Sequence, residues 1–289
     1  MEASEVRRAV EAGRTAATAL GLQADDAVVI NNSDRVVVRL IPCDVIARVS
    51  PSAHRDGAQF ELEIGRRLSE ADAPVGALEP RVEPRVYEQD GFVITLWTYY
   101  EPAAPSDLAA AGYAQTLFRL HDGLRRIDVA APHFMDRVAG AQTCVADREQ
   151  TPDLGSDDRE LLADALDRLS TAVSEGGSGE QLLHGEPHLG NVLSTRSGLL
   201  FVDLGTCCRG PVEFDLAHSL APSAEGHVLP SANEACEHYP GANQDLVEQS
   251  RLLILAMITT WRWRRVDQLP NGRHWAVEGL NQLRATLAP

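Results

Sequence analysis

The segment HGEPHLGN, residues 184–191, places a carboxylate and an amide five positions apart on a stretch that glycine and proline keep from being helical. A second acid, Asp203, lies near the end of the run VLSTRSGLLFVDLG that follows. We therefore predict a stiff loop that presents Glu186 and Asn191 directly before a strand pair ending at Asp203.

Two zinc sites can be considered for this loop and excluded. Histidines four apart around a glutamate bind zinc in metalloproteases when they share one continuous helix face, which the loop's glycine and proline prevent. His184 and Glu186 also fit the H-x-E of zinc deaminases, but the C-x-x-C partner is missing, since Cys207 and Cys208 are adjacent. Those cysteines are predicted to be packing residues.

Phosphoryl transfer matches the residue types better. It needs a metal ion to neutralise phosphate oxygens and a carboxylate that orients the attacking hydroxyl and takes its proton. Magnesium prefers oxygen ligands from carboxylates and carbonyls. We therefore expect Glu186, Asn191 and Asp203 to converge on one point around Mg²⁺.

The composition narrows the chemistry further. The chain has 26 basic residues, all of them arginine, in 289 residues. A phosphate loop of the G-x-x-x-x-G-K type and Schiff-base catalysis are excluded, because both require lysine. The formal charge of −16 argues against nucleic acid and anionic membranes as partners.

Other features predict a cytoplasmic protein. No run of about 18 apolar residues occurs, and the N-terminus lacks the apolar core of a signal peptide. The five cysteines are an odd number without a framework spacing, which favours reduced thiols.

Residues 1–97 alternate between helical and strand patterns. A helix is predicted over 4–20, three β-branched strands over about 27–50, and a helix over 57–70. The segments PRVYEQD and FVITLWTYY flank Gly91 as a hairpin. This part reads as a small sheet with one helix between its strands.

Residues 98–289 are mostly helical in pattern. Helices are predicted over 108–126, 136–150 and 157–173, the last with a capping box at Asp157 and Glu160, and again from Glu213 onward. A long, mostly buried helix is predicted from about residue 245. The exception is the strand pair that follows Asn191, joined by a turn at residues 195–198.

The stretch HGEPHLGNVLSTRSGLLFVDLGTCCRGPVEFDLAH resembles the core of the aminoglycoside phosphotransferase and choline kinase-like enzymes, relatives of protein kinases, where the loop normally reads H-G-D-x-H-x-x-N. LSEADAPV and LFRLHDGLRRID are similar to that family more loosely. The resemblance implies an α+β, two-lobed protein kinase-like fold. Its small β-rich N-lobe would be residues 1–97 and its larger, mostly helical C-lobe residues 98–289.

The resemblance also implies roles within and after the loop. Glu186 stands at the position of the catalytic base, and Asn191 and Asp203 stand at the two metal-binding positions. The residues expected to shape the loop or hold it in place are His184, His188 and Asp215.

A further set is implied for the nucleotide. The family's phosphate-binding lysine would be replaced by Arg48, which is permanently charged and holds phosphate bidentately. Its helix partner would be Glu61, with Glu63 as the alternative. The backbone of the hinge would lie beside the adenine, and its candidates are Leu96, Trp97, Thr98 and Tyr99; the aromatic pair could equally belong to the core.

The implied function is transfer of the γ-phosphate of ATP or GTP, with Mg²⁺, to a hydroxyl of a small molecule such as an aminoglycoside or another amine-bearing antibiotic or metabolite. Residues 98–289 carry a net charge of −11 against −5 for residues 1–97, which favours a cationic acceptor. Candidate contacts to it are Glu225, Glu234, Glu237 and Asp245.

Glutamate at 186 is the main departure from the family pattern. Its carboxylate extends about 1.5 Å further than that of aspartate, and misplacement by about 1 Å can cost on the order of 10²-fold in rate. The alternative hypothesis is therefore a non-catalytic nucleotide-binding protein of the pseudokinase type.

Overall fold

The computed structural model describes residues 1–103, 110–177, 179–220 and 232–287. The chain forms two compact units, described here one at a time. The first comprises Met1–Ser106, Asp122–Val129 and Asn191–Thr206, and the second comprises Asp107–His121, Ala130–Gly190 and Cys207–Pro289. The strand pair after Asn191 thus belongs to the first unit, although it lies far beyond residue 97 in sequence.

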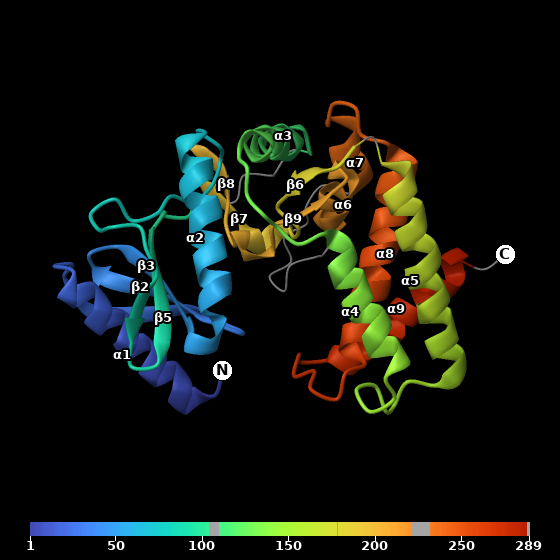
Figure 1. The fold of residues 1–289 in the computed structure, drawn as a ribbon, viewed down its shortest axis with the longest axis horizontal. Coiled ribbons are helices and arrows are strands. Elements are labelled where there is room, and N and C mark those ends of the chain that lie inside the picture. Colours follow the sequence, from blue (N-terminus) through green and yellow to red (C-terminus); the bar gives the residue numbers. More distant parts are fainter. Residues whose placement is uncertain (104–109, 178, 221–231, 288–289) are drawn as a thin grey trace. The chain divides into compact units, whose positions relative to one another are not determined.

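The first unit is built on a five-stranded antiparallel sheet of order β1-β2-β3-β5-β4 (Figure 1). Its strands are β1 (Ala24–Asn32), β2 (Val36–Pro42), β3 (Val45–Pro51), β4 (Tyr87–Gln89) and β5 (Phe92–Thr98). The predicted meander and hairpin are both present. The alternating β-branched residues of the sequence explain them, because alternation directs one set of side chains to each face.

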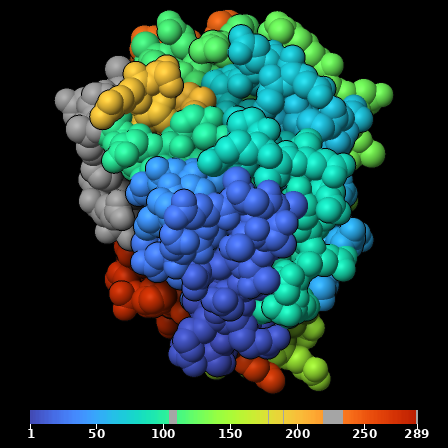
Figure 2. Space-filling view, turned by 90° about the vertical axis from the view of Figure 1, so that its left-hand side faces the viewer, coloured from blue at the N-terminus to red at the C-terminus, as the bar shows by residue number. Residues whose placement is uncertain are grey.

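Helices cover the two faces of this sheet. Helix α1 (Ala3–Ala19) packs its alanines against Val36, Val38 and Leu40 of β2 and against matching residues of β3 and β5. Helix α2 (Arg55–Glu70) lies on the other face. Figure 2 shows the outer side of the first unit, with α1 in dark blue. The small residues of α1 let the helix approach the sheet closely, and each fully buried aliphatic partner contributes roughly 1.5–3 kcal/mol.

The hairpin β7 (Val192–Thr195) and β8 (Gly198–Phe201) completes the first unit. Phe201 attaches it to the chain after α2, since its amide donates to the carbonyl of Pro74 at 2.9 Å and its carbonyl accepts from Gly76 N at 2.9 Å. The turn at residues 195–198 predicted from the sequence closes this pair, and Gly198 adopts a positive φ of 120° there. The hairpin fixes the two ends that flank it, at residues 191 and 203.

The second unit is mostly helical. Its long helices α4 (Phe134–Ala146), α5 (Ser156–Gly176), α8 (Gln244–Arg262) and α9 (Gly272–Leu287) pack on one another. Shorter elements are α6 (Val212–Leu216), α7 (Ala232–Glu237) and the antiparallel pair β6 (Gln181–Leu183) and β9 (Cys208–Gly210). Helix α3 (Ala110–Arg126) contributes residues to both units.

Two details differ from the sequence-based expectation. Helix α5 begins after Gly155 without a side-chain cap, so the capping box expected at Asp157 and Glu160 is wrong. A capping box instead starts α4, where His133 and Asp136 satisfy each other's backbone amides. Among the residues with described structure, no helix is both long and apolar enough to cross a bilayer.

Candidate active site

The β7–β8 hairpin brings Asn191 and Asp203 together in the first unit. The amide of Val202 donates to the carbonyl of Asn191 at 2.9 Å, so the residues on either side of the hairpin are paired across its open end. Asp203 has a φ of 68°, a conformation that non-glycine residues adopt at a cost and that is concentrated at functional sites. Two oxygen-bearing side chains are thereby held at one end of the hairpin.

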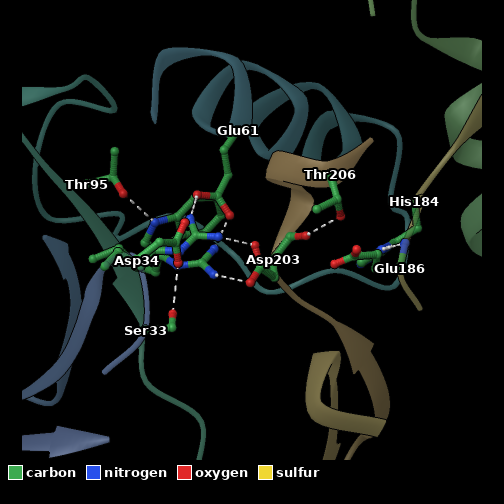
Figure 3. Close-up of polar contacts among 11 residues, drawn as sticks. Ser33, Asp34, Glu61, Thr95, His184, Glu186, Asp203 and Thr206 are labelled. Carbon is green, nitrogen blue, oxygen red and sulfur yellow. Dashed lines mark hydrogen bonds and ion pairs between the residues drawn. The ribbon is translucent and has the colours of Figure 1, made fainter. Parts of the chain in front are cut away.

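Asp203 takes part in a closed ring of four charged side chains, hereafter the charge ring, with Glu61, Arg35 and Arg48. Arg35 donates to Glu61 Oε2 at 2.8 Å and also to Asp203 Oδ1. Arg48 donates to Glu61 Oε1 and lies 3.3 Å from Asp203 Oδ2. Figure 3 shows Glu61 and Asp203 with the guanidinium nitrogens between them. Each arginine contacts one oxygen of Glu61 and one oxygen of Asp203, and the formal charges of the four side chains cancel.

Arg48 and Glu61 form the ion pair expected from the sequence. Glu61 is only 1% exposed on α2, whereas the alternative partner Glu63 binds Arg66 and Arg67 on the outer side of the same helix. Hydrogen bonds from these arginines hold the pKa of Glu63 below its ordinary value. Glu61 is therefore the helix residue that neutralises Arg48.

The sheet face around Arg48 is partly apolar. The ladder sets Arg48 opposite Val37 and Thr95, and sets Ile46 opposite Trp97. Trp97 is buried, donates from Nε1 to Thr95 Oγ1 at 2.9 Å, and lies so close to α2 that a Cβ on Gly65 would be 2.7 Å from its ring. The Trp97 ring therefore packs against α2, and the expected place of its backbone beside the base stays a prediction.

The other hinge candidates differ in what they present. The carbonyl of Leu96 accepts from Glu79 N at 3.0 Å, and the amide of Thr98 donates to Ala77 O at 2.9 Å. The side chain of Leu96 belongs to the core beneath α1. These two backbone groups therefore already have partners. Tyr99 is the one candidate of the four that lies beyond the end of β5, and its ring centroid lies 3.8 Å from the Arg39 guanidinium carbon.

The part of the loop that carries Glu186 lies in the second unit, where Glu186 is held by Arg137 of α4. Arg137 Nη2 donates to Glu186 Oε1, and Nη1 donates to the carbonyl of Gly185 at 3.0 Å. Gly185 adopts a φ of 88°, which favours glycine at this turn. The buried hydroxyl of Tyr113 donates to Pro187 O at 2.7 Å. Backbone and side chain of the loop are thus both fixed, and Arg137 sets the direction of the glutamate.

Asp215 anchors the start of the same loop. Its carboxylate is fully buried and accepts the amides of His184 and Gly185, each at 2.8 Å. His121 Nε2 donates to Asp215 at 2.9 Å, and the other nitrogen of that ring lies 2.7 Å from Tyr239 Oη. The expected anchoring role of Asp215 agrees with these contacts.

Asp215→Asn is expected to lower the free energy of unfolding by roughly 3 kcal/mol at neutral pH, because the amide cannot accept every donor that faces the carboxylate. Burial alone would raise the pKa of Asp215, but the hydrogen bond and charge of His121 hold it below the ordinary 3.8. A lowered pKa contributes stability that is present above about pH 4 and lost as the pH falls through the folded value.

Urea unfolding from pH 7 to pH 3 measures this effect. The gap between wild type and Asp215→Asn should be full at pH 7 and should narrow at acid pH. Asp164→Asn is the control, since among the described residues Asp164 pairs with Arg168 alone, on an exposed turn of α5. A pH-independent gap, or an equal loss in the control, would contradict the prediction.

The two loop histidines make local contacts. His184 is fully buried, and its Nδ1 accepts from Glu186 N at 3.3 Å. His188 Nδ1 accepts from Gly190 N at 3.1 Å, and its own amide donates to Glu186 O at 2.8 Å. Both contacts shape the loop. Cys207 and Cys208 are buried, and burial raises the pKa of Cys208 to about 12, so that it remains a thiol.

The candidate acceptor contacts are spread over α7 and α8. Glu234 and Glu237 belong to α7, and Asp245 lies in the first turn of α8. Glu225 lies outside the described residues. The contacts of these acids do not by themselves mark one of them as the acceptor ligand.

The donor set suits a hard cation that retains other ligands. Among described residues, no cluster of three histidine, cysteine or carboxylate side chains that could hold a metal is found. Asn191 and Asp203 supply only amide and carboxylate oxygens at one end of the hairpin, which fits Mg²⁺ bound chiefly through phosphate and water. Both Asp203 oxygens contact arginines here, so an ion bound at Asp203 would lie beside two positive charges.

Arg35 and Arg137 are the two site residues that sequence reasoning missed. Arg35 lies in the turn between β1 and β2, and Arg137 lies in a helix whose pattern predicts only packing. The signal available for Arg35 was its place directly after the segment NNSD (residues 31–34), at which a phosphate-covering loop is expected in kinase-like folds.

Comparison with known proteins identifies the scaffold. Residues 23–246 match the model of the phosphotransferase enzyme family. The fold is similar to amicoumacin kinase hAmiN in complex with AMP-PNP, Ca²⁺ and amicoumacin (11% identity, TM-score 0.75, covering 99% of this chain and 96% of that one). It is also similar to a choline/ethanolamine kinase family protein from Mesorhizobium loti (15% identity, TM-score 0.66, 100% and 96% covered) and to the gentamicin complex of APH(2")-IIa (12%, 0.66, 98% and 96%). Among curated protein sequences, none matches significantly. The predicted two-lobed, kinase-like α+β fold is confirmed.

Proposed function

Because this chain belongs to the phosphotransferase enzyme family, whose members are small-molecule kinases, we propose that it transfers the γ-phosphate of ATP or GTP, with Mg²⁺, to a hydroxyl of an amine-bearing small molecule. The observation that carries the proposal is the charge ring. It joins the expected phosphate-binding cation Arg48, its partner Glu61 and the expected metal ligand Asp203 in one unit. Kinase-like catalysis requires that pair and that aspartate together.

The nucleotide is assigned to the sheet face that bears Arg48. The half-buried Val37 and Ile46 provide apolar surface for a base, and Val28 on the neighbouring strand is 50% exposed. Arg48 would bind the phosphates at the end of this surface. An apolar surface accepts adenine or guanine, so both ATP and GTP are included in the test.

The transfer step assigns the proton to Glu186. The acceptor hydroxyl oxygen forms a bond to the γ-phosphorus while the bond from that phosphorus to the β–γ bridging oxygen breaks. The hydroxyl proton passes to the Glu186 carboxylate, and the nucleoside diphosphate leaves with the bridging oxygen. Arg137 would hold Glu186 toward the acceptor, since it engages both the carboxylate and the loop carbonyl.

Asn191 and Asp203 are the proposed holders of Mg²⁺. When bound, Mg²⁺ would neutralise phosphate oxygens and keep them in line for transfer. The hairpin supports this assignment because it fixes the backbones of both residues before any ligand is bound. The protein's own contribution is therefore a preset position for the two oxygen donors.

An amine-bearing acceptor is supported by charge and by the related structures. The similar structures include an amicoumacin kinase, a protein in complex with gentamicin and a protein of the choline/ethanolamine kinase family. Residues 98–289 of this chain carry a net charge of −11, which would steer a cation toward them. Antibiotic resistance is one biological role that such an activity would serve, and the cytoplasm is the compartment we propose for it.

Mg²⁺-dependent ATP and GTP turnover against a panel of aminoglycosides and amino alcohols tests the proposal. Thermal-shift screening with a nonhydrolysable nucleotide present selects the acceptors, because ligands of the native state raise its stability. Turnover that requires Mg²⁺ and an acceptor hydroxyl is the expected result. Absence of nucleotide binding would overturn the proposal.

A non-catalytic nucleotide-binding protein is the second candidate, and two observations favour it. Glutamate replaces the family's aspartate at 186, and both oxygens of Asp203 are engaged by arginines. The expected result for this candidate is tight nucleotide binding with no turnover across the whole acceptor panel.

Arg48→Lys is expected to raise the KM for the nucleotide about 10- to 100-fold while changing kcat less. Lysine retains the charge but cannot bind Glu61, Asp203 and phosphate through a planar fork, and charge-assisted hydrogen bonds contribute about 1.5–3 kcal/mol. Steady-state kinetics measures the split. Arg66→Lys, on the outer side of α2, should leave both constants near wild type, and an unchanged KM in Arg48→Lys would remove Arg48 from the phosphate site.

A further inference from the structure

Arg35 pairs with two acids of the candidate site, Glu61 and Asp203, rather than with solvent. It lies in the three-residue turn between β1 and β2, where Ser33 N donates to the Arg35 carbonyl at 3.0 Å. Its side chain, 18% exposed, reaches residues 26 and 168 positions away in sequence, Glu61 and Asp203. The turn therefore delivers a guanidinium into the charge ring, beside the expected metal ligand.

The charge ring makes Asp203 a poor cation site as it stands. Arg35 and Arg48 each engage one of its oxygens, so an incoming divalent ion would meet two positive groups a few ångströms away. Both arginines also contact Glu61, but Arg48 is carried by strand β3, which is hydrogen-bonded to β2 on one side and to β5 on the other. Arg35 is carried by the turn between β1 and β2, so its backbone is not held by strand pairing on both sides.

The guanidinium of Arg35 keeps its charge whichever partner it has. An arginine side chain is not deprotonated in proteins, so its charge does not depend on the carboxylates beside it. Guanidinium groups bind phosphate bidentately and are more weakly hydrated than ammonium groups. A polyphosphate is therefore a suitable alternative partner, and it offers more negative charge than one carboxylate.

We propose that Arg35 is a second phosphate-binding residue, which holds Asp203 when no nucleotide is bound and moves to the nucleotide's phosphates when one is. The inference rests on the proposed function, because it concerns the same nucleotide site. Transfer of Arg35 to phosphate leaves Asp203 available for Mg²⁺. Nucleotide and metal binding are then coupled, and each strengthens the other.

Calorimetric titration of Arg35→Gln with ATP in the absence of metal tests the first half of the proposal. The ATP dissociation constant should rise about 10- to 100-fold, the effect of a lost charge-assisted hydrogen bond. Adenosine lacks phosphates, so its affinity should not change. Arg55→Gln is the matched control, because Arg55 belongs to the same unit but, within the described part of the chain, pairs with the exposed Glu88 alone.

Titration with Mn²⁺ alone, as a probe for Mg²⁺, tests the second half. Removing one positive charge next to Asp203 should tighten Mn²⁺ binding to the nucleotide-free Arg35→Gln protein about tenfold or more, and should reduce the gain that ATP gives to metal binding. An arginine that only stabilises the turn would weaken both ligands or neither.

The outcomes separate this proposal from the proposed function. Wild-type protein that binds no ATP contradicts the phosphotransferase assignment itself. Wild-type binding with an unchanged ATP constant in Arg35→Gln overturns only the role of Arg35. If thermal unfolding shows that Arg35→Gln does not fold, Arg35→Lys replaces it. Lysine retains the charge, so the ATP affinity of this variant should be weaker than that of wild type but still measurable. ATP affinity equal to that of wild type, together with unchanged Mn²⁺ binding, would overturn the proposal.

Discussion

Glu186→Gln is expected to lower kcat about 10²- to 10⁴-fold, the typical contribution of a positioned general base, with little change in nucleotide affinity. The amide keeps the size of the side chain but cannot take the acceptor's proton. Single-turnover rates together with nucleotide titration measure the two effects separately. Glu180→Gln is the control, because Glu180 is a half-exposed acid of the same unit that pairs with His133.

Glu186→Asp distinguishes an impaired site from one fitted to glutamate. Arg137 holds both Glu186 and the Gly185 carbonyl, so the loop and the longer arm are positioned as a unit. Shortening the arm should move the carboxylate by about 1.5 Å and lower kcat on the order of 10²-fold. A higher rate in Glu186→Asp would show that glutamate is a defect here and would support the non-catalytic candidate.

The sequence predicted the regular elements where the apolar pattern was strong. The alternation in β2 and β3, the spacing of Ile64 and Leu68 in α2 and the hairpin at Gly91 all lead to the observed elements. The periods of strand and helix decide these elements locally. The three-residue strands β6 and β9 carry no such signal, because three residues are too few to display a period.

Helix α5 was predicted correctly, but its N-terminal capping residues were not. Asp157 and Glu160 have capping-box spacing, but the helix begins one residue earlier and Gly155 occupies the cap position. Helix boundaries depend on where the preceding chain turns, which is set by packing as well as by cap preference. The helix itself was predictable, and its first residue was not.

The residues of the candidate site also fall into two groups, those that the sequence indicated and those that it did not. Glu186, Asn191 and Asp203 are close in sequence and share a motif, so their order and the resemblance to the family's loop indicated them. Arg35 and Arg137 reach their partners across long sequence separations, and only the folded chain shows which acid each one meets. An arginine in a turn or on a helix is most often solvated, so its type and position carry little information by themselves.

Asp203→Asn is expected to lower kcat about 10²- to 10³-fold, because the amide loses the charge that would hold Mg²⁺ and because electrostatic stabilisation of the transferring phosphate is usually the largest contribution to the rate. The charge ring predicts a second, opposite effect. Without the Asp203 charge, Arg35 and Arg48 are balanced by Glu61 alone, and the site gains one net positive charge. Metal-free ATP should then bind at least as tightly as it does to wild type.

The opposite signs make this prediction hard to satisfy by accident. A variant that merely misfolds loses turnover and nucleotide binding together, whereas a variant that removes a metal ligand loses turnover alone. Asp44→Asn is the control, since Asp44 pairs with Arg39 on the exposed end of the β2–β3 turn. Full turnover in Asp203→Asn would remove Asp203 from the metal site, and a parallel loss of metal-free ATP affinity would mean that the two arginines do not bind phosphate.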